Sequence, residues 1–386
     1  MPLKTVTGKH ADPRKGRGAG INPEGRFEKT NREAFDDGWD TRDDELPPLK
    51  THVTEERVKS IITRNDSPDI PFSQSINPYQ GCEHGCSYCY SRPSHAYRNL
   101  SPGIDFETRL FAKVNAPEVL REELSRPRYK CEMIALGANT DPYQPIERRY
   151  RITRGILEVL AEFNHPVGIV TKNAMIERDL DILASMAEKR LVNVYISCNN
   201  LDHELARRLE PRCSAPQRRL QAMKRLSEAG VPVGVLVAPV IPFLTDHEIE
   251  AVLEQAWAHG ARQAGYVLLR LPWEIKEIFR DWIERHYPLK AKHVMSRVRE
   301  MRGGRDNDPN FGTRMSGTGE LAELLERRFD VACRKLGFNH GSRYATLDAT
   351  KFAVPGGGRQ MRSFETSRER GYVLAGSGSR SSEESR

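Results

Sequence analysis

Short runs rich in valine and isoleucine alternate along this chain with longer segments of helical periodicity, and this rhythm constrains the fold more than any other feature. Six of the runs are expected to be strands: residues 74–79, 131–136, 167–171, 193–197, 233–238 and 265–270. Strands that alternate with helices are typical of β/α units, whose strands pair in parallel. Right-handed crossovers would curl six such units into a partial barrel.

The segments between the runs place apolar residues at helical spacing. Helices are expected over residues 116–125, 153–163, 176–189 and 274–285. Two more are expected to begin at capping boxes, formed by Ser214 with Gln217 and by Thr245 with Glu248. The sequence therefore predicts an α/β protein, with a partial (β/α)6 barrel of parallel strands over residues 59–287.

The two ends of the chain differ from this central region. After residue 287 the strand pattern stops, and residues 288–355 are interpreted as a helical extension with an apolar stripe formed by Leu321, Leu324, Leu325, Phe329 and Ala332. Residues 1–58 form a basic N-terminal arm, and residues 356–386 are a low-complexity tail, so disordered termini are expected. Residues 15–28 could pack against the body, but a flexible arm is the default expectation.

Charge and composition narrow the possible partners only slightly. The 386 residues contain 60 Lys and Arg against 53 Asp and Glu, a net charge of +7. This balance is compatible with nucleic acid as a partner, and equally with solvated basic faces and a basic tail. No apolar run approaches 18 residues, which argues against a membrane span, and the basic start lacks the apolar stretch of a secretory signal. A cytoplasmic protein is expected.

Three of the seven cysteines fall within eight residues, as Cys82, Cys86 and Cys89 in a C-x3-C-x2-C pattern. Clustered cysteines in a cytosolic chain indicate metal or redox chemistry rather than disulfides. Thiolates are the ligands of iron–sulfur clusters, and three of them would leave one iron of a [4Fe–4S] cluster free for a substrate or cofactor. The other four are interpreted as small core residues: Cys131, Cys198, Cys213 and Cys333.

Zinc is the competing interpretation of the cysteine loop, with His84 or His95 as a fourth ligand. Structural zinc sites usually combine two separated pairs of ligands. The chain has no second C-x2-C or H-x3-H pair, so iron–sulfur binding is favoured.

The cysteine loop directly after a strand, with Tyr88 before Cys89, resembles the signature of the radical S-adenosylmethionine (SAM) superfamily. The resemblance implies the six-unit partial barrel over roughly residues 70–290. It implies a cluster whose fourth iron chelates SAM, and reductive cleavage of SAM to a 5′-deoxyadenosyl radical that abstracts hydrogen from a substrate. It also implies a reductant such as flavodoxin or ferredoxin.

The stretch GANTDPYQPIE at 137–147, followed by VTKN, YIS and PVIPF, resembles the branch of spore photoproduct lyase and its DNA repair photolyase-like relatives. In that family a hydrogen-donating cysteine lies in the stretch where this chain has Ala138. Cys198 closes a strand and is a speculative substitute, whereas Cys131 opens a strand and is expected to point elsewhere. Photoproduct repair is therefore not transferred to this chain.

Cofactor contacts follow from the same resemblance, because barrels of parallel strands place their sites at the carboxyl ends of the strands. The implied SAM-binding residues are Tyr88 at the adenine, Asn139 and Thr140 at the amino group, Lys172 and Ser197 at the carboxylate and ribose, and Val240 to Pro242 in the adenine pocket. The chain lacks the GGE-like motif often found at the amino group, and Asp141 with Pro142 could simply form an Asx turn.

Arg270 ends the sixth expected strand inside the barrel. A buried arginine needs an anionic partner, which here would be SAM, the substrate or a carboxylate such as Glu274.

Three functional hypotheses result. The first is a radical SAM enzyme acting on a large substrate, with nucleic acid as a candidate. The second is a non-catalytic zinc-binding nucleic-acid module. The third is a radical SAM enzyme acting on a peptide or small metabolite.

Overall fold

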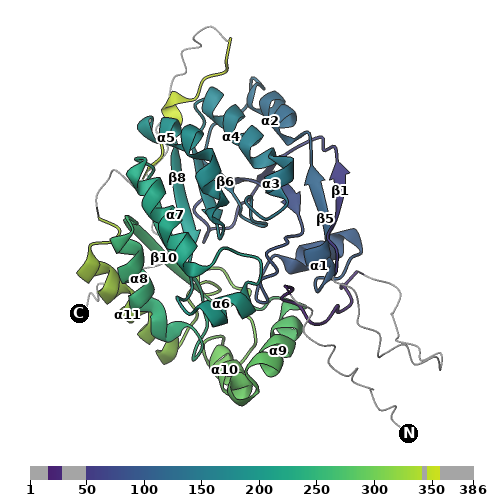
Figure 1. The fold of residues 1–386 in the computed structure, drawn as a ribbon, viewed down its shortest axis with the longest axis vertical. Helices are drawn as coiled ribbons and strands as arrows, with labels where there is room; N and C mark the ends of the chain where they lie inside the picture. Colours follow the sequence, from purple (N-terminus) through teal and green to yellow (C-terminus); the bar gives the residue numbers. More distant parts are fainter. Residues whose placement is uncertain (1–15, 28–48, 341–345, 357–386) are drawn as a thin grey trace, which may run out of the picture.

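A computed structural model describes residues 16–27, 49–340 and 346–356 of the chain (Figure 1). The first fifteen residues and nearly all of the expected low-complexity tail lie outside the described residues. No helix in the described ranges is long and apolar enough to cross a membrane.

A seven-stranded sheet forms the centre of the molecule, with the strand order β10-β9-β8-β7-β6-β3-β2. Six strands run in parallel: β3 (Gln74–Ile76), β6 (Ile134–Leu136), β7 (Val167–Thr171), β8 (Val192–Ser197), β9 (Val233–Val240) and β10 (Gln263–Leu268). The seventh, β2 (Ile62–Arg64), adds an antiparallel edge next to β3. The predicted partial (β/α)6 barrel of parallel strands is confirmed, and the six parallel strands lie side by side in their order along the chain.

Helices pack on this sheet and on one another around a large apolar core. They are α2 (Ala116–Leu124), α4 (Ile152–Glu162), α5 (Leu180–Glu188), α7 (Pro216–Glu228), α8 (Ile249–Ala258) and α9 (Ile275–His286), with short helices α1 (Asp105–Thr108), α3 (Glu147–Tyr150) and α6 (His203–Leu209) between them. Both β7 and β8 alternate buried and half-buried side chains, the two-residue period of a strand.

Neither predicted capping box forms. Helix α7 begins after Ala215, and the Ser214 hydroxyl instead accepts a hydrogen bond from Ala174 N at 2.9 Å. The Thr245 hydroxyl accepts from Ile241 N at 2.9 Å. Both hydroxyls accept hydrogen bonds from backbone amides in segments that follow strands, because buried amides there also need partners.

Two segments of the predicted arm belong to the body. Strand β1 (His52–Glu56) pairs in parallel with β5 (Arg109–Lys113), which also pairs with β4 (Tyr79–Gln80) in a second, three-stranded sheet. Residues 16–27 lie against the cysteine loop and α1, with Arg17 and Ala19 buried. The default expectation of a flexible arm is wrong for these residues.

The C-terminal extension contains α10 (Pro288–Glu300) against α9 and α11 (Glu320–Leu336) against α8 (Figure 1). Leu325, Phe329 and Ala332 are buried as predicted, whereas Leu324 is 50% exposed, so the apolar stripe is narrower than the sequence indicates. Arg302, buried at 2% exposure, ties the connecting loop to the end of β10 by donating to the carbonyls of Leu268 and Leu269.

A second, smaller apolar cluster positions the site. It joins Cys86 and Tyr88 of the cysteine loop to side chains of α6, α9 and α10, including Leu209, Trp282 and Val298. The cysteine loop is therefore held between the barrel and the helices that follow β10.

Candidate cluster and cofactor site

The three clustered cysteines lie on an irregular loop that leaves β4 and reaches the carboxyl ends of β6, β7 and β8. Cys82 and Cys86 are each 7% exposed, Cys89 is half-buried, and all three are free thiols. Within the described residues, no three His, Cys, Asp or Glu side chains lie close enough together to hold a metal ion between them. Three soft thiol donors on one short loop are nevertheless the donor set of a cubane, which places each ligand at a separate corner.

The pKa values of the cysteines in this loop are consistent with binding of a metal cation. Burial, together with the neighbouring Cys86 and Cys82 thiolates, raises the pKa of Cys89 to about 12. A hydrogen bond from the Cys213 thiol, 3.7 Å away, lowers the pKa of Cys86 although burial opposes ionisation. Neighbouring buried thiolates disfavour one another's ionisation, and bound iron would supply the positive charge that lets them ionise.

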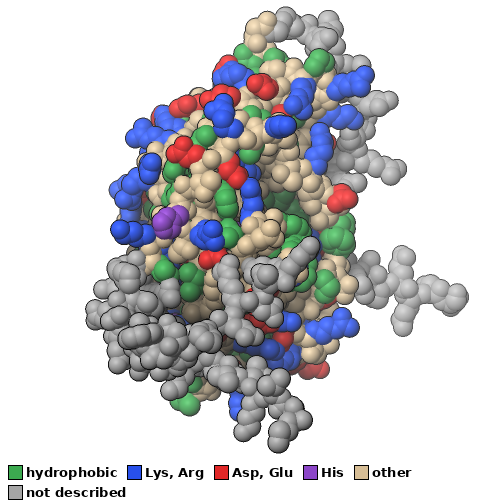
Figure 2. Space-filling model, turned by 90° about the vertical axis from the view of Figure 1, so that its right-hand side faces the viewer, with side chains coloured by type: hydrophobic (Ala, Val, Ile, Leu, Met, Phe, Trp, Pro, Cys, Tyr) green, Lys and Arg blue, Asp and Glu red, His purple; other side chains and the backbone are tan. Residues whose placement is uncertain are grey.

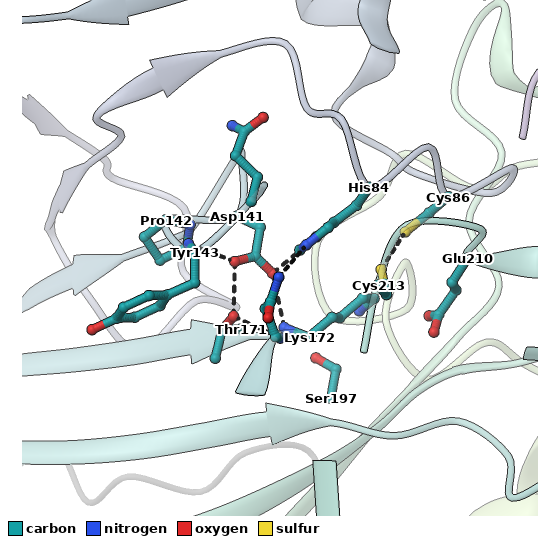
Figure 3. A network of polar contacts seen from close by, with 12 residues as sticks. His84, Cys86, Asp141, Pro142, Tyr143, Thr171, Lys172, Ser197, Glu210 and Cys213 are labelled. Carbon is teal, nitrogen blue, oxygen red and sulfur yellow. Dashed lines mark hydrogen bonds and ion pairs between the residues drawn. The ribbon is translucent and has the colours of Figure 1, made fainter. Parts of the chain in front are cut away.

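Asp141 joins three parts of the site (Figure 3). Its carboxylate accepts hydrogen bonds from Lys172 N and the Thr171 hydroxyl, both at 2.8 Å, and lies 3.3 Å from His84 Nδ1. Burial opposes ionisation, but His84 and these hydrogen bonds lower the pKa of Asp141. Tyr143 N also donates to it at 2.9 Å, which is the Asx turn expected as the structural alternative.

The two histidines considered as zinc ligands are engaged by protein groups. His84 contacts Asp141 and, through Nε2, Asn173 Nδ2 at 3.2 Å. His95 Nε2 lies 3.0 Å from Arg109 O, and burial lowers the pKa of His95 to about 4.

A buried ionic network lies beside Cys86. Glu210 accepts hydrogen bonds from the Tyr88 hydroxyl and from Arg219, and both charged side chains are almost fully buried. Arg219 also donates to the carbonyl of Ser197 at 2.9 Å. Burial opposes a charge on Lys172, but Glu210 and Cys86 raise the pKa of its ammonium group. The predicted residues Tyr88 and Lys172 thus both interact with the Glu210 carboxylate, and Ser197 is connected to it through Arg219.

Other predicted site residues have mainly structural contacts. The backbone amides of Asn139 and Thr140 both donate to Asn77 Oδ1, and the Thr140 hydroxyl donates to Tyr79 O at 2.8 Å. Val240 and Ile241 are fully buried in the apolar core.

Cys198, the speculative hydrogen donor, is also fully buried. Its thiol donates to Asn200 O at 3.4 Å, and burial raises the pKa of Cys198 to about 11. Cys131 precedes β6 and is half-buried, and Cys333 is a core residue of α11.

Arg270 does not pair with Glu274, which binds Arg26 at 3.4 Å instead. Its guanidinium lies 5.7 Å from the Tyr90 ring and contacts Met315 Sδ at 3.5 Å. Arg270 Nε is buried and has no hydrogen-bond partner within the described part of the chain. An unpaired cationic side chain of this kind suits an anionic or aromatic guest.

Sequence reasoning missed Cys213, which it assigned to the core. The thiol lies 3.7 Å from Cys86 Sγ and lines a cavity of about 210 Å³ between α6 and α7. A signal was present, because residues 210–215 belong to the connection that leaves β8 through α6, and connections after parallel strands begin at one edge of the sheet.

Comparison with known proteins decides the family. Residues 76–256 match the Radical SAM superfamily. An uncharacterised protein of Mycobacterium tuberculosis is 39% identical over 234 residues, which cover 60% of this chain and 68% of that protein. The chain belongs to the radical SAM superfamily. Its cofactors are accordingly a [4Fe–4S] cluster and SAM.

Two further comparisons concern proteins with named activities. Solved structures of spore photoproduct lyase share the fold, with a TM-score of 0.53, 16% identity, and coverage of 74% of this chain and 80% of that one. A radical SAM Nα-GlyT isomerase of Pseudomonas phage M6 is 27% identical over 198 residues, which cover 49% of this chain and 38% of the isomerase.

The Glu210 network yields a prediction about stability. Glu210→Gln leaves the buried Arg219 guanidinium without its counter-charge, so we expect the free energy of unfolding to fall by about 3 kcal/mol near neutral pH. The folded-state pKa of Glu210 lies below its usual value of 4.5, because Arg219 and Lys172 outweigh the burial that opposes ionisation. The difference between wild type and variant should therefore be complete above pH 4.5 and shrink as the pH falls through the folded-state pKa.

Urea unfolding of both proteins at several pH values measures this difference. Glu204→Gln is the matched control, because Glu204 pairs with Arg208 on an exposed helix surface and should change stability by less than about 0.5 kcal/mol. Equal effects of the two substitutions would contradict the account of the network.

Proposed function

We propose that this chain is a radical SAM enzyme whose Cys82, Cys86 and Cys89 hold the [4Fe–4S] cluster and whose substrate is a nucleic acid. The supporting observation is that three free thiols, two buried and one half-buried, share one loop at the carboxyl edge of the sheet. At the same edge, Lys172 follows β7 and Ser197 ends the neighbouring strand β8. When bound, the cluster and SAM supply reductive cleavage of a C–S bond to a 5′-deoxyadenosyl radical.

The chain's own residues would bind and orient SAM. The Lys172 ammonium group, kept charged by Glu210, is suited to the SAM carboxylate. Ser197, the buried last residue of β8, would offer its hydroxyl to the ribose. The Tyr88 side chain is held by Glu210, so its backbone is fixed at the position proposed for the adenine. An external one-electron donor is required, for which flavodoxin and ferredoxin are candidates.

Reductive SAM cleavage tests the reaction directly. The protein is purified anaerobically, reconstituted with iron and sulfide, and incubated with SAM and dithionite, and 5′-deoxyadenosine is quantified. We expect product from the wild type and a loss of at least about a hundredfold in Cys86→Ala. Cys333→Ala is the matched control, since that thiol lies in the core of α11 and should leave cleavage unchanged. A wild-type protein that binds zinc and leaves SAM intact would overturn the proposal.

The choice of substrate rests on exposed aromatic side chains near the carboxyl end of β10. We call five exposed aromatic residues the rim: Phe27, Tyr90, Tyr97, Trp273 and Phe311. Their exposed fractions range from 48% at Phe27 to 70% at Tyr97. Arginines lie against these rings: Arg26 is 4.4 Å from the Trp273 ring, and Arg314 is 4.6 Å from Phe311. Proteins that bind single-stranded nucleic acids present such exposed rings and guanidinium groups, and the bases stack on them.

Charge alone would not support this choice. On the described part of the face in Figure 2, lysine and arginine side chains are spread among acidic ones rather than gathered in one patch. Arg26 and Arg314 are paired with Glu274 and Asp69. The rim therefore favours recognition of bases by stacking, with phosphate contacts as a smaller contribution.

Binding of a fluorescently labelled single-stranded oligonucleotide tests the rim. We expect Tyr97→Ala and Trp273→Ala each to weaken binding by about tenfold, since stacking contributes roughly 1–3 kcal/mol per base. The control is Leu324→Ala, a change at a half-exposed apolar residue on α11, which should have no effect. Binding that is absent in the wild type, or unchanged in both rim variants, would contradict a nucleic-acid substrate and favour a peptide or small metabolite.

A further inference from the structure

The N-terminal segment Gly16–Gly20 lies against the cysteine loop although it precedes the loop by some sixty positions and lies outside the part of the chain that matches the superfamily. It is drawn in dark purple below α1 in Figure 1. Arg17, Gly18 and Ala19 are all buried, and Ala19 belongs to the same apolar cluster as Cys86 and Tyr88. A segment buried at this place needs an explanation beyond a flexible arm.

Glu107 connects the segment to the loop. Its fully buried carboxylate accepts hydrogen bonds from Ala19 N at 2.8 Å and Gly18 N at 3.1 Å, and it pairs with Arg92. Arg92 in turn donates through Nε to the carbonyl of Cys86 at 2.9 Å. One chain of polar contacts therefore runs from the N-terminal segment to the backbone of a proposed cluster ligand.

The N-terminal segment also contacts the backbone of the cysteine loop directly. Gly18 packs so tightly on the loop that a Cβ placed there would lie 1.7 Å from Gly85 O and 3.3 Å from Ser87 N. These two residues flank Cys86. Backbone atoms cannot move aside as a flexible side chain can, so position 18 accepts only glycine unless the loop itself shifts.

The other side of the loop is fastened to the same segment by Arg212. Its Nε donates to Gly16 O at 3.0 Å, its backbone N donates to His84 O at 3.2 Å, and its Nη1 pairs with Glu83 at 2.9 Å. Arg17 ties the segment to the body by donating to Glu107 O and Leu49 O, each at 2.8 Å.

We propose that residues 16–20 are a clasp that positions the cysteine loop and shields the cluster from solvent. The proposal rests on the proposed function, because it assigns these residues a role toward the cluster. Gly18 and Arg17 are positioning residues: Gly18 packs on the backbone on both sides of Cys86, and Arg17 holds the segment against the body. An irregular ligand loop requires this kind of outer support, and losing it commonly weakens metal binding by tenfold or more.

Two glycines of the clasp provide a matched test. Gly18→Ala forces a Cβ onto loop backbone, whereas a Cβ at Gly20 would meet only the ends of the Arg285 and Asp281 side chains. After anaerobic reconstitution we expect Gly18→Ala to lose its cluster absorbance in air about tenfold faster than the wild type and to show an altered EPR signal. Gly20→Ala should stay close to the wild type in both measurements.

Arg17→Ala is a second variant, because it loosens the clasp without pressing on the loop. It should accelerate cluster loss in the same direction, while circular dichroism confirms a folded barrel. Clusters of wild-type lifetime and EPR signal in both Gly18→Ala and Arg17→Ala would overturn the clasp. A wild-type protein that never assembles a cluster would instead contradict the proposed function, so the two failures are distinguishable.

Discussion

The structure depends on hydrogen bonds to the backbone of the cysteine loop, which is buried and has no regular secondary structure. Polar backbone groups removed from water need partners, and a loop cannot supply them internally as a helix does. Here the partners come from distant segments: Cys82 N donates to Phe106 O at 2.9 Å, and Ser87 N donates to Leu209 O at 3.0 Å. The side chains of Gln144 and Arg92 bond to the backbone of Glu83 and Cys86. Much of what surrounds the cysteines is needed to hold them in place.

The parallel sheet determines what else lies at that position. Loops after parallel strands meet at one edge of the sheet. Three residues therefore approach the cysteine loop although they are far from it in the sequence: Asp141 after β6, Lys172 after β7 and Glu210 beyond β8. Their charges compensate one another: Glu210 is matched by Arg219 and Lys172. The cysteine thiolates would add negative charge to this region, and bound iron would be their counter-charge.

The parts of this arrangement that depend on local pattern could be predicted. Apolar runs indicate the six parallel strands, and the spacing of Cys82, Cys86 and Cys89 indicates the kind of ligand set. The resemblance to the superfamily implies SAM-binding roles for Lys172 and Ser197 at their strand ends, and these roles stay predictions. The contacts that depend on tertiary packing could not be predicted: nothing near Gly18 in the sequence indicates Gly85 as its neighbour, and nothing near Arg270 indicates Met315 rather than Glu274. A glycine-rich, basic stretch is compositionally the same whether it is packed or free.

The central claim is that the three thiols hold a [4Fe–4S] cluster with one iron open to SAM. EPR spectroscopy of the anaerobically reconstituted, dithionite-reduced protein, recorded with and without SAM, tests this most directly. The account predicts the signal of a reduced [4Fe–4S] cluster whose shape changes when SAM is added, because SAM binds the iron that lacks a protein ligand. A cluster signal that is indifferent to SAM, or a protein that takes up zinc and gives no signal, would contradict the account.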